Sequence, residues 1–349
     1  MLAKNESSCQ VDILLLQPLY KEIIMCTAIS LTTQDHYFGR NLDLEYSYIE
    51  TITITPRNFP FSFRQKKTIS QHYAMIGTAF VQDYYPLYYD ATNETGLSMA
   101  GLNFPENAYY FPSDEEKDNI TPFEFIPWIL AQCATVSEAR VLLDKINLLD
   151  EAFSDTLPLS PLHWMIADKV ESIVVESTKD GLFIHDNPVG VLTNNPPFEM
   201  QLFHLNNYMN LSNDPPENHF AEHLDLKKYS NGMGAMGLPG DWSSQSRFVR
   251  ASFVKMNSKC GSSEEESVSQ FLHLLGSVEF PRGCVEMEKD VYEITVYSSC
   301  CNTDKGIYYY KTYENHDITA VDMHREDLES TELICYPMKK ETCLHHLIR

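Results

Sequence analysis

The sequence is short of positive charge. Its 349 residues contain 26 lysines and arginines against 49 aspartates and glutamates, a formal net charge of −23. A surface this acidic repels phosphate groups, and no long block of consecutive basic residues provides a local exception. The composition therefore argues against DNA, RNA and anionic membranes as partners and favours a small-molecule substrate.

Long hydrophobic runs and paired cysteine motifs are also missing. No stretch approaches the ~20 apolar residues of a membrane-spanning helix. The apolar run nearest the N-terminus, Ile13 to Leu16, is too short for a signal-peptide core and has no basic region before it. The nine cysteines form no CxxC pair, which fits a reducing compartment better than a disulfide framework. We therefore expect a cytoplasmic protein.

The patterns that are present indicate an α+β protein in one continuous domain. A hydrophobic content of 43% is ample for a packed core, and no linker or repeat divides the chain. Strands are predicted at 26–31, 37–43, 50–55, 73–80, 172–178, 292–299 and 306–313. Helices are predicted at 122–146 and 263–277. The order favours antiparallel sheets that carry helices on their faces.

Cys26 follows Met25 directly and begins a strand-like run. In a chain that began at Cys26, this residue would carry both a thiol and a free α-amine. An α-amine has a reference pKa of about 7.7–8.0, much closer to neutrality than that of a lysine. Such an amine can act as a general base and activate the thiol as a nucleophile.

The residues after Cys26 predict a hairpin that could complete a site. With the turn near Gln34 and Asp35, Asp43 is expected opposite Cys26, where its carboxylate could orient the α-ammonium group. Arg40, in the same strand, could lower the thiol pKa or hold an anionic substrate. The alternative is a buried cysteine in an edge strand with a surface Arg/Asp pair. A slip of one residue would exchange the two faces of the strand.

Eight segments resemble, in order, those of the choloylglycine hydrolases, the N-terminal-nucleophile family that contains bile salt hydrolases and penicillin V acylases. They are MCTAISL (25–31), FGRNLDLEYSY (38–48), ITPRNF (54–59), NETGLSMAGLNFP (93–105), LPLSPLHWMIAD (157–168), DNPVGVLTNNPPF (186–198), GLPGDWSSQSRFVR (237–250) and YSSCCNTDKGIYYYKTYEN (297–315). The resemblance spans residues 25 to about 340. It implies an αββα sandwich of two antiparallel sheets between helix layers.

The resemblance also implies roles for individual residues. The implied catalytic set is Cys26 as nucleophile, Arg40 and Asp43 as its electrostatic and orienting partners, and Asn103, Asn194 and Arg247 as further active-site residues. Asn103 matches the bile salt hydrolase form of a position where several penicillin V acylases carry tyrosine. The implied substrate-lining positions are Leu42, Phe153, Leu157 and Leu162. All four are apolar, which suits a steroid skeleton, although ordinary core residues would look the same.

The predicted function is hydrolysis of the amide bond in glycine- or taurine-conjugated bile acids, without metal or cofactor. The alternatives are a penicillin V or N-acyl-homoserine lactone acylase, which Asn103 argues against, and a non-catalytic bile-acid-binding protein. Residues 219–223 match the zinc pattern HxxEH without a third ligand, and residues 232–237 match GxGxxG without a flanking strand and helix. Residues 196–240 resemble the family's assembly excursion, which implies a homotetramer.

Residues 1–25 precede the point where the family resemblance begins. We expect a misassigned start codon, because Lys21-Glu22 can be encoded by AAGGAG, a purine run of the kind that bacterial ribosomes recognise, two codons before Met25. A cleaved leader is the second possibility. A retained extension would block the α-amine of Cys26 and leave a binding protein. The predicted division is an extension at 1–25 and one domain at 26–349.

Overall fold

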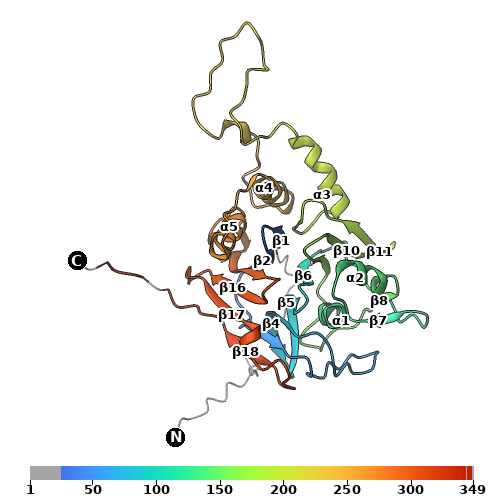
Figure 1. Cartoon of the computed structure of the whole chain (residues 1–349). Coiled ribbons are helices and arrows are strands. Elements are labelled where there is room, and N and C mark those ends of the chain that lie inside the picture. The colour runs from blue at the N-terminus through green and yellow to red at the C-terminus, as the bar shows by residue number, and fades with distance from the viewer. Residues whose placement is uncertain (1–24, 343, 348–349) are drawn as a thin grey trace.

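The computed structural model describes residues 25–342 and 344–347. Two antiparallel sheets are stacked face to face (Figure 1). The six-stranded sheet has the order β12 (Val191–Leu192), β1 (Met25–Thr32), β2 (His36–Leu44), β15 (Ile294–Asn302), β16 (Ile307–Thr312) and β17 (Thr319–Asp322). The eight-stranded sheet has the order β11 (Gly181–Asp186), β10 (Ser172–Thr178), β9 (Leu162–Ala167), β6 (Ser98–Asn103), β5 (Tyr85–Asn93), β4 (Met75–Gln82), β3 (Thr51–Thr55) and β18 (Ile334–Pro337).

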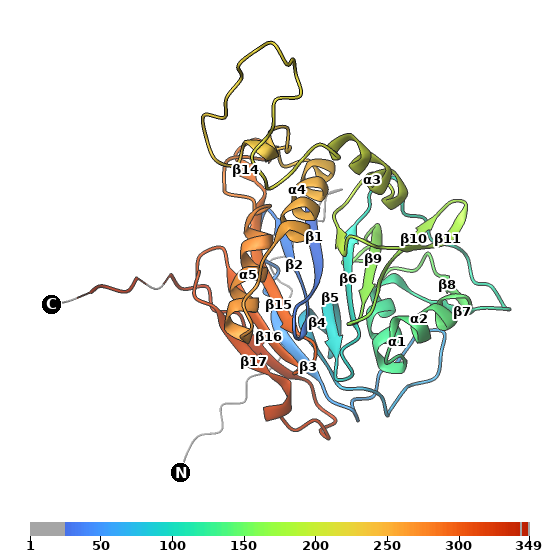
Figure 2. The same cartoon turned by 45° about the horizontal axis from the view of Figure 1, so that its top comes forward.

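Helices cover the outer faces of both sheets (Figure 2). Helices α4 (Ser244–Asn257) and α5 (Glu264–Gly276) lie on the six-stranded sheet, and α1 (Phe125–Gln132) and α2 (Val136–Leu143) lie on the eight-stranded sheet. The predicted αββα sandwich is therefore confirmed. The remaining elements are α3 (Phe198–His204) and the short strand pairs β7 (Asp118–Ile120) with β8 (Ile146–Leu148) and β13 (Glu286–Glu288) with β14 (Val291–Tyr292). Within 25–342 and 344–347, no helix is both long and apolar enough to cross a membrane.

The core has two parts, because the eight-stranded sheet is buried on both faces. One cluster fills the space between the sheets and continues beneath α4 and α5. The other packs α1 and α2 against the outer face of the eight-stranded sheet, where the rings of Phe125 and Trp164 meet edge to face at 4.8 Å. Full burial of each such ring stabilises the fold by roughly 2–3 kcal/mol. The sheets are thus held rigidly around the space between them.

Helix boundaries follow from capping. Helix α5 matches the prediction at 263–277, and it begins with a capping box between Ser263 and Glu266. The helical region predicted at 122–146 contains two helices, because α1 ends at Gln132 and α2 begins separately. The Thr135 side chain accepts a hydrogen bond from the backbone N–H of Glu138, and this N-cap favours a new helix start over continuation. Helix α4 was not predicted, although Ser243 caps it in the same way.

The register of the β1–β2 hairpin differs by one residue from the prediction. Cys26 pairs with Leu42, and Asp43 pairs with Met25. Directly opposed side chains in an antiparallel pair lie on the same face, and neighbours along a strand lie on opposite faces. Cys26 and Arg40 therefore face the eight-stranded sheet, whereas Asp43 faces α4 and α5. The prediction that Asp43 lies opposite Cys26 is wrong.

Candidate active site

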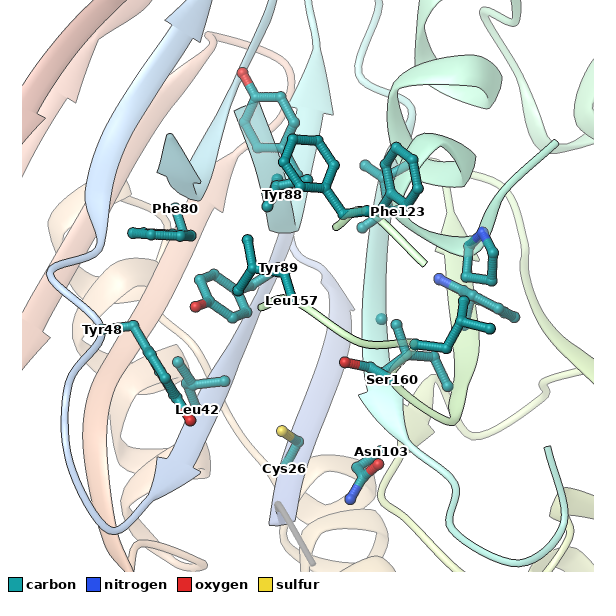
Figure 3. Close-up of a pocket in the computed structure, with 18 of the residues that line it drawn as sticks. Cys26, Leu42, Tyr48, Phe80, Tyr88, Tyr89, Asn103, Phe123, Leu157 and Ser160 are labelled. Carbon is teal, nitrogen blue, oxygen red and sulfur yellow. The ribbon is translucent and has the colours of Figure 1, made fainter. Parts of the chain in front are cut away.

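A pocket between the two sheets ends at Cys26. Its cavity volume is about 200 Å³, it is open to solvent at its mouth, and most of its lining is apolar or aromatic. Figure 3 shows the Cys26 sulfur directed into this pocket toward Tyr89 and Leu157, with Leu42 on one side and Asn103 on the other. The Cys26 side chain is buried, since only 1% of its surface is exposed. A ligand in the pocket would therefore meet the thiol at its inner end.

Arg40 is the cation on the pocket side of the hairpin. Its Nη2 donates a hydrogen bond to Cys26 Sγ, and its Nη1 donates to the carbonyl oxygens of Tyr89 at 2.9 Å and Gly101 at 2.7 Å. These bonds join β2 to the opposite sheet and fix the guanidinium beside the sulfur. Burial raises the pKa of the Cys26 thiol, and the charge of Arg40 counteracts part of this rise. The arrangement stabilises a thiolate that burial alone would suppress.

The backbone nitrogen of Cys26 is held from the other side of the sheet. It donates a hydrogen bond to Asn194 Oδ1 at 2.9 Å, and Arg247 Nη2 donates to the same oxygen at 2.7 Å. Arg247, on α4 and fully buried, also donates through Nη1 to the Cys26 carbonyl oxygen at 2.6 Å and to Thr27 Oγ1 at 2.7 Å. Since Arg247 lies behind the sheet and does not line the pocket, it cannot meet a substrate anion there.

Asn194 is itself fixed by a buried polar network. Its side-chain Nδ2 donates to the carbonyl oxygen of Asn103 at 2.8 Å, and its backbone N–H donates to Ser244 Oγ at 2.8 Å. Gln201 Nε2 donates to its carbonyl oxygen. His163 Nε2 lies 2.9 Å from the carbonyl oxygen of the preceding residue, Thr193. The amide group is thereby aimed at the Cys26 nitrogen. Asn103 was predicted from the sequence, whereas sequence reasoning missed Ser244, Gln201 and His163.

Two buried carboxyl groups lie on the helix side of the hairpin. Asp43 Oδ1 accepts a hydrogen bond from Thr295 Oγ1 at 2.6 Å, and Glu293 Oε1 accepts one from the Met25 backbone N–H at 2.9 Å. Burial raises the pKa of Asp43 to about 7 and that of Glu293 to about 8. Sequence reasoning missed Glu293. A usable signal existed, because it is the one charged residue in the predicted strand 292–299.

Comparison with known proteins gives the family. The model of the linear amide C–N hydrolases, choloylglycine hydrolase family, matches residues 26–336. The chain belongs to this family. It is accordingly a hydrolase that acts on linear amide C–N bonds.

Individual members of the choloylglycine hydrolase family match over nearly their whole length. A bile salt hydrolase/transferase from Lactiplantibacillus plantarum is 56% identical over 317 residues, which cover 91% of this chain and 98% of that protein. A crystal structure of a mutant conjugated bile acid hydrolase from Clostridium perfringens superposes with a TM-score of 0.86 at 38% identity, covering 93% of this chain and 100% of that one. Penicillin V acylase from Agrobacterium tumefaciens shares the fold, with a TM-score of 0.70 at 18% identity and coverage of 92% and 99%.

The predicted site residues of this choloylglycine hydrolase divide between the pocket and the space behind it. The pocket is lined by Cys26, Arg40 and Asn103. Asn194 and Arg247 hydrogen-bond to the Cys26 backbone, and Asp43 lies on the helix side of the hairpin, where it is bonded to Thr295. The predicted substrate positions Leu42, Phe153, Leu157 and Leu162 all line the pocket. Further lining residues that sequence reasoning missed include Tyr48, Phe80, Leu87, Tyr88, Phe123 and Ile126. They come from other strands, loops and helices, so their shared location is not visible in the linear sequence.

The two remaining motifs lie far from this pocket in extended chain. Residues 219–223 are not helical, and four of the five are exposed. Residues 232–237 include only a short 3-10 turn, Met233–Ala235, and neither a strand nor an α-helix flanks it. In the part of the chain that the structure describes, no group of three or more His, Cys, Asp or Glu side chains could hold a metal ion.

Proposed function

We propose that this chain hydrolyses the amide bond of glycine- or taurine-conjugated bile acids with Cys26 as the nucleophile. The observation that carries the proposal is the apolar pocket that ends at the Cys26 sulfur. A fused hydrocarbon ring system fits apolar walls, and its side-chain amide would then reach the thiol at the inner end. The names of the bile salt hydrolases described above support this choice of substrate.

In the proposed reaction, the Cys26 thiolate attacks the amide carbon and the carbonyl electrons move to oxygen. The Asn103 side chain, at the pocket wall beside Cys26, is the proposed donor to this oxyanion. The C–N bond breaks as the α-ammonium group of Cys26 protonates the leaving nitrogen, which leaves a thioester on Sγ. The neutral amine then takes a proton from water, and the resulting attack releases the bile acid and restores the thiol.

The mechanism requires a chain that begins at Cys26. We propose that residues 1–25 are absent from the working enzyme, either because translation starts at Met25 or because a leader is cleaved. The family match that begins at residue 26 supports this, as does the hydrogen bond that already directs the Cys26 nitrogen to Asn194. Residues 1–24 lie outside the described residues. The intact mass of protein purified from the native gene tests the proposal.

Side-by-side hydrolysis of a conjugated bile acid and penicillin V tests the substrate class. We expect faster release of glycine or taurine from the conjugate than of the acyl group from penicillin V. Faster turnover of penicillin V would contradict the proposal. Binding of the conjugate without release of the amino acid, by protein whose mass includes residues 1–25, would identify a non-catalytic binding protein.

We also propose a homotetramer that works in the cytoplasm. The segment between α3 and α4 extends away from the body of the molecule (Figure 1) and exposes large apolar side chains. They include Met209, Phe220, Tyr229 and Met236, each at least 59% exposed, and Phe203 near the end of α3 is also exposed. Such a cluster is typical of an assembly surface. Sedimentation velocity tests the tetramer, and cell fractionation tests the location. Six cysteines within residues 25–342 and 344–347 are free, which supports a reducing compartment, whereas Cys335 is disulfide-bonded.

A further inference from the structure

Glu293 has no role in the reaction proposed above, yet its carboxyl group lies beside the start of the proposed mature chain. It stands between β14 and β15 with 1% of its surface exposed. Its Oε1 accepts the Met25 backbone N–H at 2.9 Å, and its Oε2 has no hydrogen-bond partner among the described residues. A buried carboxyl oxygen without a partner is costly in free energy, so this placement needs a reason.

The buried carboxyl groups around Glu293 outnumber the cation that they share. Asp43 Oδ2, from the neighbouring strand β2, also has no partner among the described residues. The cation that faces both carboxyl groups is Arg247. Its guanidinium donates hydrogen bonds to neutral atoms, including the Trp242 and Cys26 carbonyl oxygens. Arg247 is therefore the cation that the two buried carboxyl groups share, while Arg40, which also acts on Asp43, is hydrogen-bonded to Cys26 Sγ across the sheet. Burial raises the pKa of each carboxyl group, and the neighbouring Asp43 raises that of Glu293 further, so joint ionisation of the pair is disfavoured while Met25 is attached.

A free α-ammonium group on Cys26 would supply the missing charge. Removal of Met25 replaces the neutral peptide nitrogen of Cys26 by an ammonium group, already directed at Asn194 Oδ1. The Met25 amide that Glu293 contacts is one residue away along the strand, a rise of about 3.4 Å. Two carboxylates would then face Arg247 and one ammonium group, and the charges would balance.

We infer that Glu293 is a positioning residue for the α-amine of Cys26, acting with Asp43 as its counter-charge. This inference rests on the proposed function and extends it. A carboxylate beside the ammonium stabilises the protonated amine, which must donate a proton to the leaving nitrogen. Other charged groups that face this cluster are Glu279 after α5, Glu45 after β2, and the Cys26–Arg40 pair across the sheet. None of these groups contacts Met25, whereas Glu293 accepts a hydrogen bond from its backbone N–H.

The test is the pH profile of kcat/KM for a glycine-conjugated bile acid in Glu293→Gln. Wild type is assayed first, and only proteins whose intact mass begins at Cys26 are compared. The alkaline limb reports deprotonation of the α-ammonium group, which must be protonated to donate to the leaving nitrogen. We expect Glu293→Gln to move this limb down by about one pH unit, because it removes a nearby negative charge. Glu288→Gln, the same change at an exposed position of β13, should leave the limb in place.

Glu293→Asp provides a second measurement if Glu293→Gln fails to fold. The shorter side chain draws the carboxylate back, so the limb should move in the same direction by a smaller amount. An active variant with an unmoved limb, or with kcat/KM lowered equally at every pH, would overturn the inference and leave Glu293 a structural residue. Absence of hydrolysis by wild type would instead contradict the proposed function itself.

Discussion

The two faces of the β1–β2 hairpin are equally buried but chemically opposite. The face toward the eight-stranded sheet carries Cys26 and Leu42 at an apolar pocket, with Arg40 as its cation. The face toward α4 and α5 carries Asn41, whose Nδ2 donates to the Leu275 carbonyl oxygen at 3.0 Å, and Asp43. A side chain in a strand belongs to one face, whereas a backbone nitrogen lies in the plane of the sheet. The hairpin can therefore direct the Cys26 thiol into the pocket, while groups on the helix side hold the Cys26 nitrogen.

Removing the Cys26 thiol should have the largest effect of these changes. It should abolish hydrolysis and leave the stability of the fold nearly unchanged. Cys26→Ala is expected to lower kcat by at least about 10⁴-fold, since no other group can form the thioester. The change removes one sulfur, so thermal unfolding should shift little. Cys300→Ala, at an equally buried free cysteine on β15, is the control and should retain activity. Surviving hydrolysis in Cys26→Ala would refute the nucleophile assignment.

The hairpin face toward α4 and α5 should make the free energy of unfolding depend on pH. In protein that retains Met25, burial raises the pKa of Asp43 from its ordinary 3.8 to about 7. A carboxyl group whose folded pKa is raised stabilises the fold below its unfolded pKa, and this stability is lost as pH rises through the folded pKa. Asp43→Asn should therefore flatten the fall in unfolding free energy between about pH 4 and 7, by at most about 4 kcal/mol.

Urea unfolding at a series of pH values measures this change in protein whose mass includes Met25. Asp180→Asn, in an exposed turn, should leave the pH dependence unaltered. Protein that begins at Cys26 should show a shallower fall than uncleaved protein, because the ammonium group stabilises ionised Asp43. Identical curves for the two forms would argue against any contact between the amine and this face.

Arg40→Met tests the electrostatics of the pocket face. The variant loses the charge beside Cys26 Sγ and leaves the carbonyl oxygens of Tyr89 and Gly101 without their donor. We expect kcat/KM to fall about 10²-fold, and the pH at which Cys26 becomes half-reactive toward iodoacetamide to rise. Arg57→Met, at a surface ion pair with Glu94, is the matched control. An unchanged alkylation profile would mean that Arg40 acts through structure only.

Leu157→Ala should have the smallest effect, confined to binding. This half-buried side chain lines the pocket from the loop before β9. Loss of its apolar contact with a steroid costs about 1 kcal/mol, so KM should rise about fivefold with kcat nearly unchanged. Val141→Ala, at an exposed position of α2, should change neither constant. A fall in kcat without a change in KM would place Leu157 at the reacting centre instead.

Local signals in the sequence were reliable where the chemistry is local. The cap at Ser263 with Glu266 three residues later predicts α5, and period-two alternation predicts β3. The same approach did not separate α1 from α2 at Thr135, because helical periodicity continues across the interruption. It also placed Asp43 one residue out of register, since hairpin register depends on the turn and on the packing of both faces together.

The sequence by itself determined the family, the αββα fold that the family implies, and the candidate thiol at Cys26, because these are carried by ordered segments of residue types. Only the tertiary structure decided which face each side chain serves, which residues wall the pocket, and that Glu293 reaches the residue before Cys26 from 268 positions away. The physical reason is that contacts between layers depend on the packing of all the strands and helices at once, whereas a sequence motif records only the neighbours along the chain.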